Sequence, residues 1–282
     1  NIDRIPGPKG DNYPEDCSVE DCLITMTGRD EKQTAPVHIS MSHKITVTHC
    51  SIYDVPRAGI NINEGTFGGH VIDHCDVFNT VLETGDHGSF NSWGRDRFWT
   101  PDVNITSAMV AKNPDMPSWD MLEPNIIRNS RWRCDHGWDI DLDDGSSNYQ
   151  IYNNLLLNGG LKMREGYHRS ATNNVIINNG LHPHVWYANS GDVFRQNIVF
   201  KAYQPAIMDN VIAADGPWGK ELDHNFYATG KDQMMAFAKN NCDRNSLNGD
   251  PQFVSAGTGD FRVKTGSPVF GLGFANFPMN DF

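Results

Sequence analysis

The chain has 282 residues, 38% of them hydrophobic and 21% charged, which suits one large folded domain and excludes a disordered chain. The formal net charge of −12 argues against a general nucleic-acid binder, because such a protein needs a basic face. No apolar run reaches the roughly 18 residues of a membrane-spanning helix.

The N-terminal part of the chain begins at Asn1 rather than Met, and strand-like runs start almost at once. The first strand of a stacked β-fold exposes an edge that needs a cover. We therefore expect an N-terminal portion to be missing, or a second chain to cover this end.

Short strand-like runs then recur along the chain, each next to a His or an Asn. The polar positions that mark them are His49, His74, Asn129, Asn153, Asn174, Asn197 and Asn225. Apart from one long gap, they are 21 to 28 residues apart, which is too short for a propeller blade. The apolar positions are Ile and Val as often as Leu, which disfavours a leucine-rich repeat. The repeat predicts an all-β fold, a right-handed parallel β-helix over residues 1–282, with the marker residues stacked at one corner.

Cysteines follow the same spacing. Cys50 and Cys75 are one repeat apart and are expected to stack as free thiols rather than to form a disulfide. Cys17 and Cys22 are close enough to pair locally, and no CxxC spacing indicates a zinc site.

Two segments interrupt the repeat. Residues 94–124 carry several Pro and Trp residues and predict one further turn of the repeat plus a long loop insertion, a feature that is often functional. Residues 231–282 predict a C-terminal cap, which begins with a short helix whose apolar side carries Met234, Met235 and Phe237.

A functional face is predicted where strands follow the Gly or Pro of each repeat. Phe90, Ile140, Met163 and Val185 are aligned as core residues, so that their neighbours point outward. The outward columns are then Ser89, Asp139, Lys162 and His184; Asn91, Asp141, Arg164 and Trp186; and Trp93 with Asp143. Asp is a poor strand former, so three Asp residues in one strand indicate a function.

Glycoside hydrolysis is the chemistry that these carboxylates favour, since it needs one carboxylic acid and one carboxylate across the scissile bond. Crowded carboxylates raise one another's pKa, which supplies an acid near neutral pH. Asp141 and Asp143 are the first catalytic candidates, and Asp139 and Glu165 are the next. The residues predicted to bind substrate are His87, Asn91, Trp93, Arg95, Lys162, Arg164, His184 and Trp186.

Three alternatives remain open. A polysaccharide lyase would use Lys162 or Arg164 as base, with calcium held by the aspartates. A calcium loop proper is disfavoured, because its twelfth position is Gln150 rather than Glu. A non-catalytic carbohydrate-binding β-helix would use the same face, and simple ion pairs between adjacent strands would explain part of it. No cofactor is expected, although calcium stays open, and His182-Pro-His184 has no third metal ligand at a clear spacing.

Several longer phrases resemble a known group. They are Ala58–Ile62, Val81–Arg95, Asp139–Gly145, Leu161–Gly166 and His182–Ala188. They resemble secreted bacterial right-handed parallel β-helix proteins, among them glycoside hydrolase family 141, over about Cys22 to Phe274. The resemblance implies an α-L-fucosidase or xylanase activity with acidic catalytic residues, and a secreted or periplasmic location. It also implies a longer protein, with more sequence before Asn1.

Overall fold

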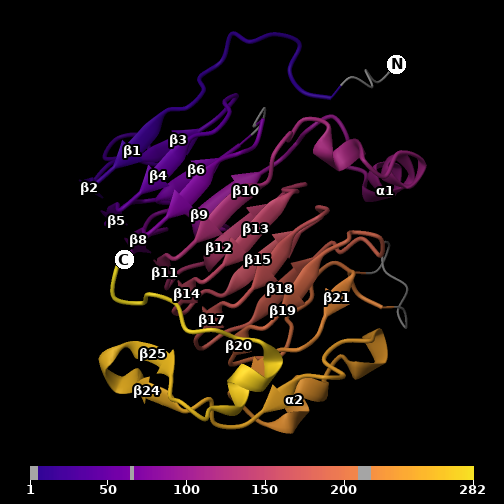
Figure 1. Cartoon of the computed structure of the whole chain (residues 1–282). Helices are drawn as coiled ribbons and strands as arrows, with labels where there is room; N and C mark the ends of the chain where they lie inside the picture. Colours follow the sequence, from indigo (N-terminus) through magenta and orange to yellow (C-terminus); the bar gives the residue numbers. More distant parts are fainter. Residues whose placement is uncertain (1–5, 64–66, 209–216) are drawn as a thin grey trace.

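The computed structural model describes residues 6–63, 67–208 and 217–282, and most of its regular structure is parallel β-sheet (Figure 1). Within these ranges the strands form three parallel sheets and one antiparallel pair. The first sheet contains, in spatial order, β1 (Ser18–Glu20), β4 (Thr46–Thr48), β7 (Val71–Asp73), β10 (Asn125–Arg128), β13 (Tyr149–Tyr152), β16 (Ser170–Thr172), β19 (Val193–Arg195) and β21 (Glu221–Leu222). The second contains β2 (Leu23–Thr25), β5 (Ser51–Tyr53), β8 (Asp76–Phe78), β11 (Arg131–Arg133), β14 (Leu155–Leu156), β17 (Val175–Ile176), β20 (Ile198–Val199), β22 (Phe226–Tyr227) and β23 (Leu247–Asn248). The third contains β3 (Val37–Ile39), β6 (Ile60–Ile62), β9 (Gly88–Trp93), β12 (Trp138–Asp143), β15 (Leu161–Arg164) and β18 (Leu181–His184).

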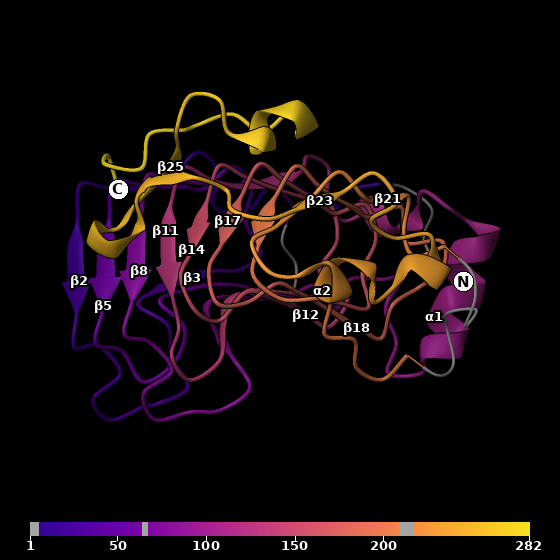
Figure 2. The ribbon, with the colours of Figure 1, turned by 90° about the horizontal axis from the view of Figure 1, so that it is seen from below.

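The chain visits the three sheets in turn. Strands β1, β2 and β3 enter the first, second and third sheets, and β4, β5 and β6 repeat the cycle in parallel beside them. Figure 2 shows β2, β5, β8 and β11 as successive neighbours. The predicted all-β parallel fold is therefore confirmed.

The main hydrophobic core is lined by inward residues from all three sheets. They include Val47, Ile72, Ile127 and Ile151 from the first, Ile52, Val77 and Trp132 from the second, and Ile60, Phe90 and Ile140 from the third. β-Branched and aromatic side chains fill such a half-buried pleated surface well, which is why these short runs form strands.

The turn from the first to the second sheet repeats a left-handed backbone position. His49, His74, Asn129, Asn153 and Asn173 all have a φ between 44° and 58°. The rings of His49 and His74 stack 5.0 Å apart, and the side-chain amides of Asn153 and Asn173 each donate to the Asn of the preceding cycle. Asn tolerates this conformation better than most residues, which explains the marker residues of the repeat.

A second polar ladder lies one residue further along and is buried. Its members are Asn154, Asn174, Asn197 and Asn225. The single predicted Asn column is therefore wrong in detail, because it mixed two adjacent ladders. Cys50 and Cys75 hold the equivalent buried positions in earlier cycles and are free thiols, as expected. Cys17 and Cys22 are also free, so their local pairing is not observed.

The insertion at residues 94–124 is more ordered than the predicted loop. It contains α1 (Val103–Lys112) and the 3-10 helix η1 (Met116–Ser118). Asp102 caps α1 by accepting from the backbone N–H groups of Asn104 and Ile105. Its weak helix formers gave no clear signal, and packing beside Tyr167 and Tyr187 holds the segment in place.

The C-terminal segment departs from a simple end cap. The helix α2 (Lys231–Met235) begins where expected and contacts β22 and β23, and η2 (Ala238–Asn240) follows it. The antiparallel strands β24 (Phe253–Ser255) and β25 (Asp260–Val263), with η3 (Ala256–Thr258) and η4 (Pro268–Leu272), come next. This last part packs over the outer side of the second sheet and runs back toward its first strands (Figure 2).

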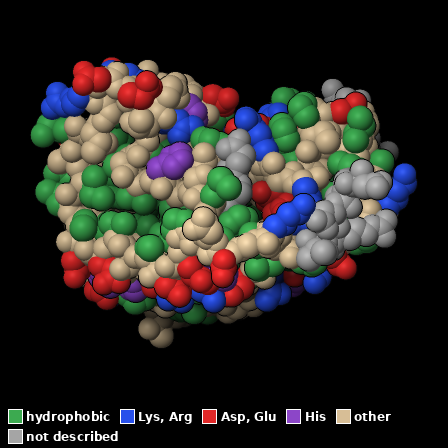
Figure 3. Space-filling model, turned by 90° about the horizontal axis from the view of Figure 1, so that it is seen from above, with side chains coloured by type: hydrophobic (Ala, Val, Ile, Leu, Met, Phe, Trp, Pro, Cys, Tyr) green, Lys and Arg blue, Asp and Glu red, His purple; other side chains and the backbone are tan. Residues whose placement is uncertain are grey.

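The strands β1, β2 and β3 lie at the edges of their sheets, each with one described neighbour. Large hydrophobic side chains are exposed near this edge, at Leu23, Met26 and Met41. The view from above shows hydrophobic side chains gathered toward the same side (Figure 3). The prediction that further sequence or a second chain covers this end stays a prediction.

Candidate functional site

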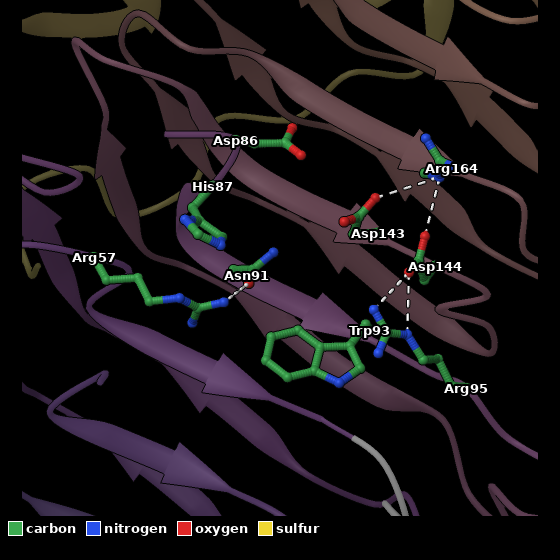
Figure 4. A pocket seen from close by; sticks show the side chains of 9 residues that line it. All are labelled: Arg57, Asp86, His87, Asn91, Trp93, Arg95, Asp143, Asp144 and Arg164. Atoms are coloured by element: carbon green, nitrogen blue, oxygen red, sulfur yellow. Dashed lines mark hydrogen bonds and ion pairs between the residues drawn. The ribbon is translucent and has the colours of Figure 1, made fainter. Parts of the chain in front are cut away.

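A pocket of about 360 Å³ lies on the outer face of the third sheet (Figure 4). We call it the main pocket. It is lined by Arg57, Asp86, His87, Asn91, Trp93, Arg95, Asp143, Asp144 and Arg164. Of these, β9, β12 and β15 supply Asn91, Trp93, Asp143 and Arg164, whose side chains point outward by strand alternation.

Between β9 and β12 the register agrees with the predicted alignment, since Ile140 pairs with Phe90, but from β12 to β15 and from β15 to β18 it differs by two residues at each step. Asp141 pairs with Lys162, not Arg164, and Lys162 pairs with His182. The alignment counted from Gly and Pro positions, but Leu161 follows Gly160 directly and is itself the partner of Ile140. A slip of two residues keeps every strand side chain on its face, so the outward side predicted for the residues of β9, β12 and β15 stands, while the neighbours predicted for Lys162 and Arg164 are wrong.

Lys162 is the buried centre of the charged cluster. Its Nζ lies 3.1 Å from Asp141 Oδ1, 3.1 Å from Asp143 Oδ1 and 4.1 Å from the centroid of Trp138. Burial alone lowers the pKa of Lys162, but the two carboxylates outweigh it and raise the pKa overall. Lys162 is 2% exposed and therefore lies behind the main pocket, where it positions Asp143.

Asp141 and Asp139 do not reach the pocket, contrary to their predicted catalytic roles. Both are completely buried. Asp141 accepts from Asn91 Nδ2 at 3.1 Å besides meeting Lys162, and burial raises its pKa to about 8. Asp139 accepts from the backbone N–H groups of Cys134, Asn158 and Gly160, and burial raises its pKa to about 7. Asp139 thus joins two turns of the chain.

Four charged residues, Arg95, Asp143, Asp144 and Arg164, line the other side of the pocket, and the predicted catalytic residue Glu165 is buried next to them without lining it. Arg164 Nε lies 3.5 Å from Asp143, 3.2 Å from Asp144 and 3.0 Å from Glu165. Arg95 donates two hydrogen bonds to Asp144 Oδ2, at 3.1 and 2.9 Å. The carboxyl groups of Asp144 and Glu165 also hydrogen-bond to each other.

The proton of this carboxyl pair belongs mainly to Glu165. Burial, and then the hydrogen bond with Asp144, raise the pKa of Glu165 to about 7. The pKa of Asp144 is lowered: burial opposes the shift, but hydrogen bonds with Glu165 and Arg95 and the charge of Arg164 prevail. Near neutral pH the pair therefore holds one proton next to the pocket.

Of the predicted substrate-binding residues His87, His184 and Trp186, only His87 lines the main pocket. Burial, with Arg57 nearby, lowers the pKa of His87 to about 4, and burial with Lys162 and Arg164 does the same for His184. His87 lines the pocket, whereas His184 packs against Trp138. Trp186 is wrong as a substrate contact: it is completely buried in the core, because Val185 has a φ of 45° and breaks the strand alternation.

A second pocket of about 660 Å³ adjoins the main pocket through the shared residue Asp86. It is lined by Asp86, Cys134, Asp135, His136, Gly137, Trp138, Asn158, Gly159, Asn178, Asn179, His182 and Lys201. Two neighbouring hollows that share Asp86 thus lie at the third sheet.

Three pocket residues were missed from the sequence. Asp144 was assigned to the turn after the Asp run, and Asp86 lay in a phrase from which only its neighbours were chosen. Arg57 comes from the connection between β5 and β6, 34 residues before Asn91, which it contacts. Only the charge-rich phrase around Asp86 offered a signal.

Metal and membrane features give no further assignment. Across residues 6–63, 67–208 and 217–282, no three His, Cys, Asp or Glu side chains are grouped so that they could hold a metal ion. The helices in those ranges are all too short or too polar to cross a bilayer.

Comparisons with protein-family models, with curated proteins and with solved structures find no match to this chain.

Proposed function

We propose that the three sheets form a right-handed parallel β-helix and that the main pocket is the active site of a glycoside hydrolase. The supporting observation is the group Asp143, Asp144 and Glu165: three carboxyl groups on one arginine, with one shared proton. The substrate is a poly- or oligosaccharide, and the protein is secreted or periplasmic and bacterial. The resemblance of several sequence phrases to glycoside hydrolase family 141 supports the same proposal.

In this proposal Glu165 holds the proton and passes it to the Asp144 carboxylate, which lines the pocket and hands it on to the leaving glycosidic oxygen. Asp143 is the second carboxylate, which attacks the sugar or activates a water molecule. One oxygen of each aspartate lies within 3.5 Å of Arg164 Nε, so the two oxygens are at most twice that distance apart. Retaining enzymes hold their carboxyl groups about 5–5.5 Å apart and inverting enzymes about 6.5–9.5 Å apart, so this bound is compatible with both, and the anomeric configuration of the first product distinguishes them.

A lyase that uses Lys162 or Arg164 as base is less well supported. The pKa of each is raised, because nearby carboxylates outweigh burial. A general base must be deprotonated near the working pH, which both cations resist. The Lys162 ammonium also fills the space between Asp141 and Asp143, where a calcium ion would sit.

The direct test is a glycan panel with product analysis. We expect new reducing ends without the ultraviolet absorbance of an unsaturated sugar. Absorbing products would indicate the lyase instead. If the protein binds a glycan of the panel but cleaves none of them, it is a carbohydrate-binding β-helix, and the proposal is contradicted.

Activity is expected to fall as the pH rises through about 7. Glu165 has a raised pKa, so its proton is present below about pH 7 and lost above it. The value of kcat/KM should then fall about tenfold per pH unit on the alkaline side. Glu165→Gln removes the titrating proton and should lower the activity and abolish this limb. An unchanged pH profile in Glu165→Gln would show that Glu165 has no part in proton delivery.

Longer substrates are expected to be cleaved better than short ones, because the second pocket continues from the main pocket at Asp86. Lys201 is exposed at the second pocket. Lys201→Ala should reduce the ratio of kcat/KM between a hexasaccharide and a disaccharide of the same glycan. The same ratio in wild type and variant would mean that the second pocket binds no sugar.

A further inference from the structure

Arg57 differs from the other cations of the main pocket in its partners. Arg95 meets Asp144, and Arg164 meets Asp143, Asp144 and Glu165. Behind the pocket, Lys162 meets Asp141, Asp143 and, at 4.0 Å, Asp86. Within the described ranges, no carboxylate lies within 4.0 Å of the Arg57 guanidinium. It donates instead to two neutral amide oxygens, Asn61 Oδ1 at 2.7 Å and Asn91 Oδ1 at 3.1 Å.

Arg57 is also largely removed from water. The residue is 5% exposed, and its guanidinium carbon lies 5.2 Å from the centroid of the Trp93 ring. Burial lowers the pKa of Arg57, and only the more distant Asp141 opposes that shift. A buried charge without a counter-charge is costly in free energy. Binding of an anion beside Arg57 would reduce that cost.

The geometry leaves room for such an anion. A guanidinium has five N–H donors, and the two amide contacts account for two of them. In Figure 4 Arg57 lies across the pocket from Arg95 and Arg164, beside His87 and Asn91. An anionic group at Arg57 would therefore lie apart from the proposed catalytic carboxylates, on another part of the sugar or on its neighbour.

We propose that Arg57 binds an anionic substituent of the substrate, a carboxylate or a sulfate, so that the enzyme acts on an acidic glycan. This inference rests on the proposed function for its substrate class. The preference for an acidic glycan does not follow from the proposed function, since a neutral glycan would satisfy Asp143, Asp144 and Glu165 equally well. Planar, bidentate recognition of such oxyanions is the task to which arginine is best suited.

Matched glycans provide the first test. Glucuronoxylan, polygalacturonate and alginate are each compared with their carboxyl-reduced forms, and sulfated galactans with their desulfated forms, for binding and for cleavage. We expect at least one acidic glycan to bind at least tenfold more tightly than its neutral counterpart. A preference lost on carboxyl reduction indicates a carboxylate ligand, and one lost on desulfation indicates a sulfate ligand. If no acidic form is preferred in either binding or cleavage, the proposal is overturned.

Asn61→Asp offers a variant that need not disturb the fold. Asn61 is buried, is not among the residues lining the pocket, and its Nδ2 has no hydrogen-bond partner in the described structure. Aspartate there keeps the side-chain shape and gives Arg57 an internal carboxylate at the place of the Asn61 amide oxygen. We expect about tenfold weaker binding of the acidic glycan, no comparable loss for the neutral form, and no loss of thermal stability.

Arg57→Gln and Arg57→Lys complete the series. Arg57→Gln should bring the ratio of acidic to neutral affinity close to one, and Arg57→Lys should leave an intermediate ratio. An equal loss for acidic and neutral glycans in all three variants would overturn the proposal even if cleavage persists. Tight, Arg57-dependent binding of an acidic glycan without any cleavage would instead overturn the proposed function and leave this inference standing.

Discussion

Asp143→Asn is expected to lower kcat/KM by about 10³-fold while leaving the protein folded. The carboxylate lies in the main pocket, and loss of a catalytic acid, base or nucleophile commonly costs about 10²–10⁴-fold. Asparagine keeps the shape, and Lys162 retains its contact with Asp141. Steady-state kinetics on the best glycan of the panel, with a thermal melt of each variant, measure the effect.

Asp21→Asn is a suitable control, because Asp21 is exposed on a turn with a φ of 51°, which asparagine tolerates. Asp144→Asn should match the loss in Asp143→Asn. Asp141→Asn should cost less, about tenfold, since its carboxylate acts only through Lys162 and Asn91. Full activity in Asp143→Asn, or a larger loss in Asp141→Asn than in Asp143→Asn, would contradict the assignment of the pocket carboxylates.

The parallel architecture could be predicted because its cause is local and repeated. A residue such as Asn129 or His74 stands at a left-handed turn once per cycle, and β-branched residues occupy the strand just before it. These preferences do not depend on distant parts of the chain, so they are visible in the sequence. The outward position of Asp143 and Arg164 follows from the same alternation.

The exact neighbours could not be predicted in the same way. The register between β12 and β15 depends on the length and shape of the chain between them, and a two-residue slip changes every ion pair without changing any face. Burial of Asp139 depends on the chain at Asn158 and Gly160, which folds over it from the next cycle. Such tertiary contacts leave no local pattern.

Arg57 shows why the most informative pocket residue was missed. It stands in a connection rather than a strand, and its importance comes from a missing partner. A sequence shows which charges are present but not which of them are neutralised. Trp186 shows the opposite error, because it was predicted to bind substrate but lies in the core. The positive φ at Val185 directs its side chain inward.

Asn174→Ala is expected to lower the free energy of unfolding by about 3–5 kcal/mol. The Asn174 side chain accepts from the backbone N–H of Asn154 and donates to the carbonyl oxygens of Ile151 and Thr172. The contacts with Asn154 and Ile151 are buried and that with Thr172 is half-buried, and each buried polar group left without a partner costs about 1–3 kcal/mol. Denaturant titration with circular dichroism measures the change.

Asn178→Gly tests whether the cost comes from the ladder rather than from losing any asparagine. Asn178 is exposed and has a φ of 60°, which glycine adopts freely, so its change should stay within about 0.5 kcal/mol. A repeated inner ladder also predicts that Asn174→Ala and Asn197→Ala are not additive, since the two side chains bond to each other. Equal effects of Asn174→Ala and Asn178→Gly would mean that backbone pairing and core packing hold the three sheets together without the buried amides. A large loss confined to the ladder would instead assign to these amides the alignment of each cycle on the next, and hence the alignment that brings Asp143 beside Arg164.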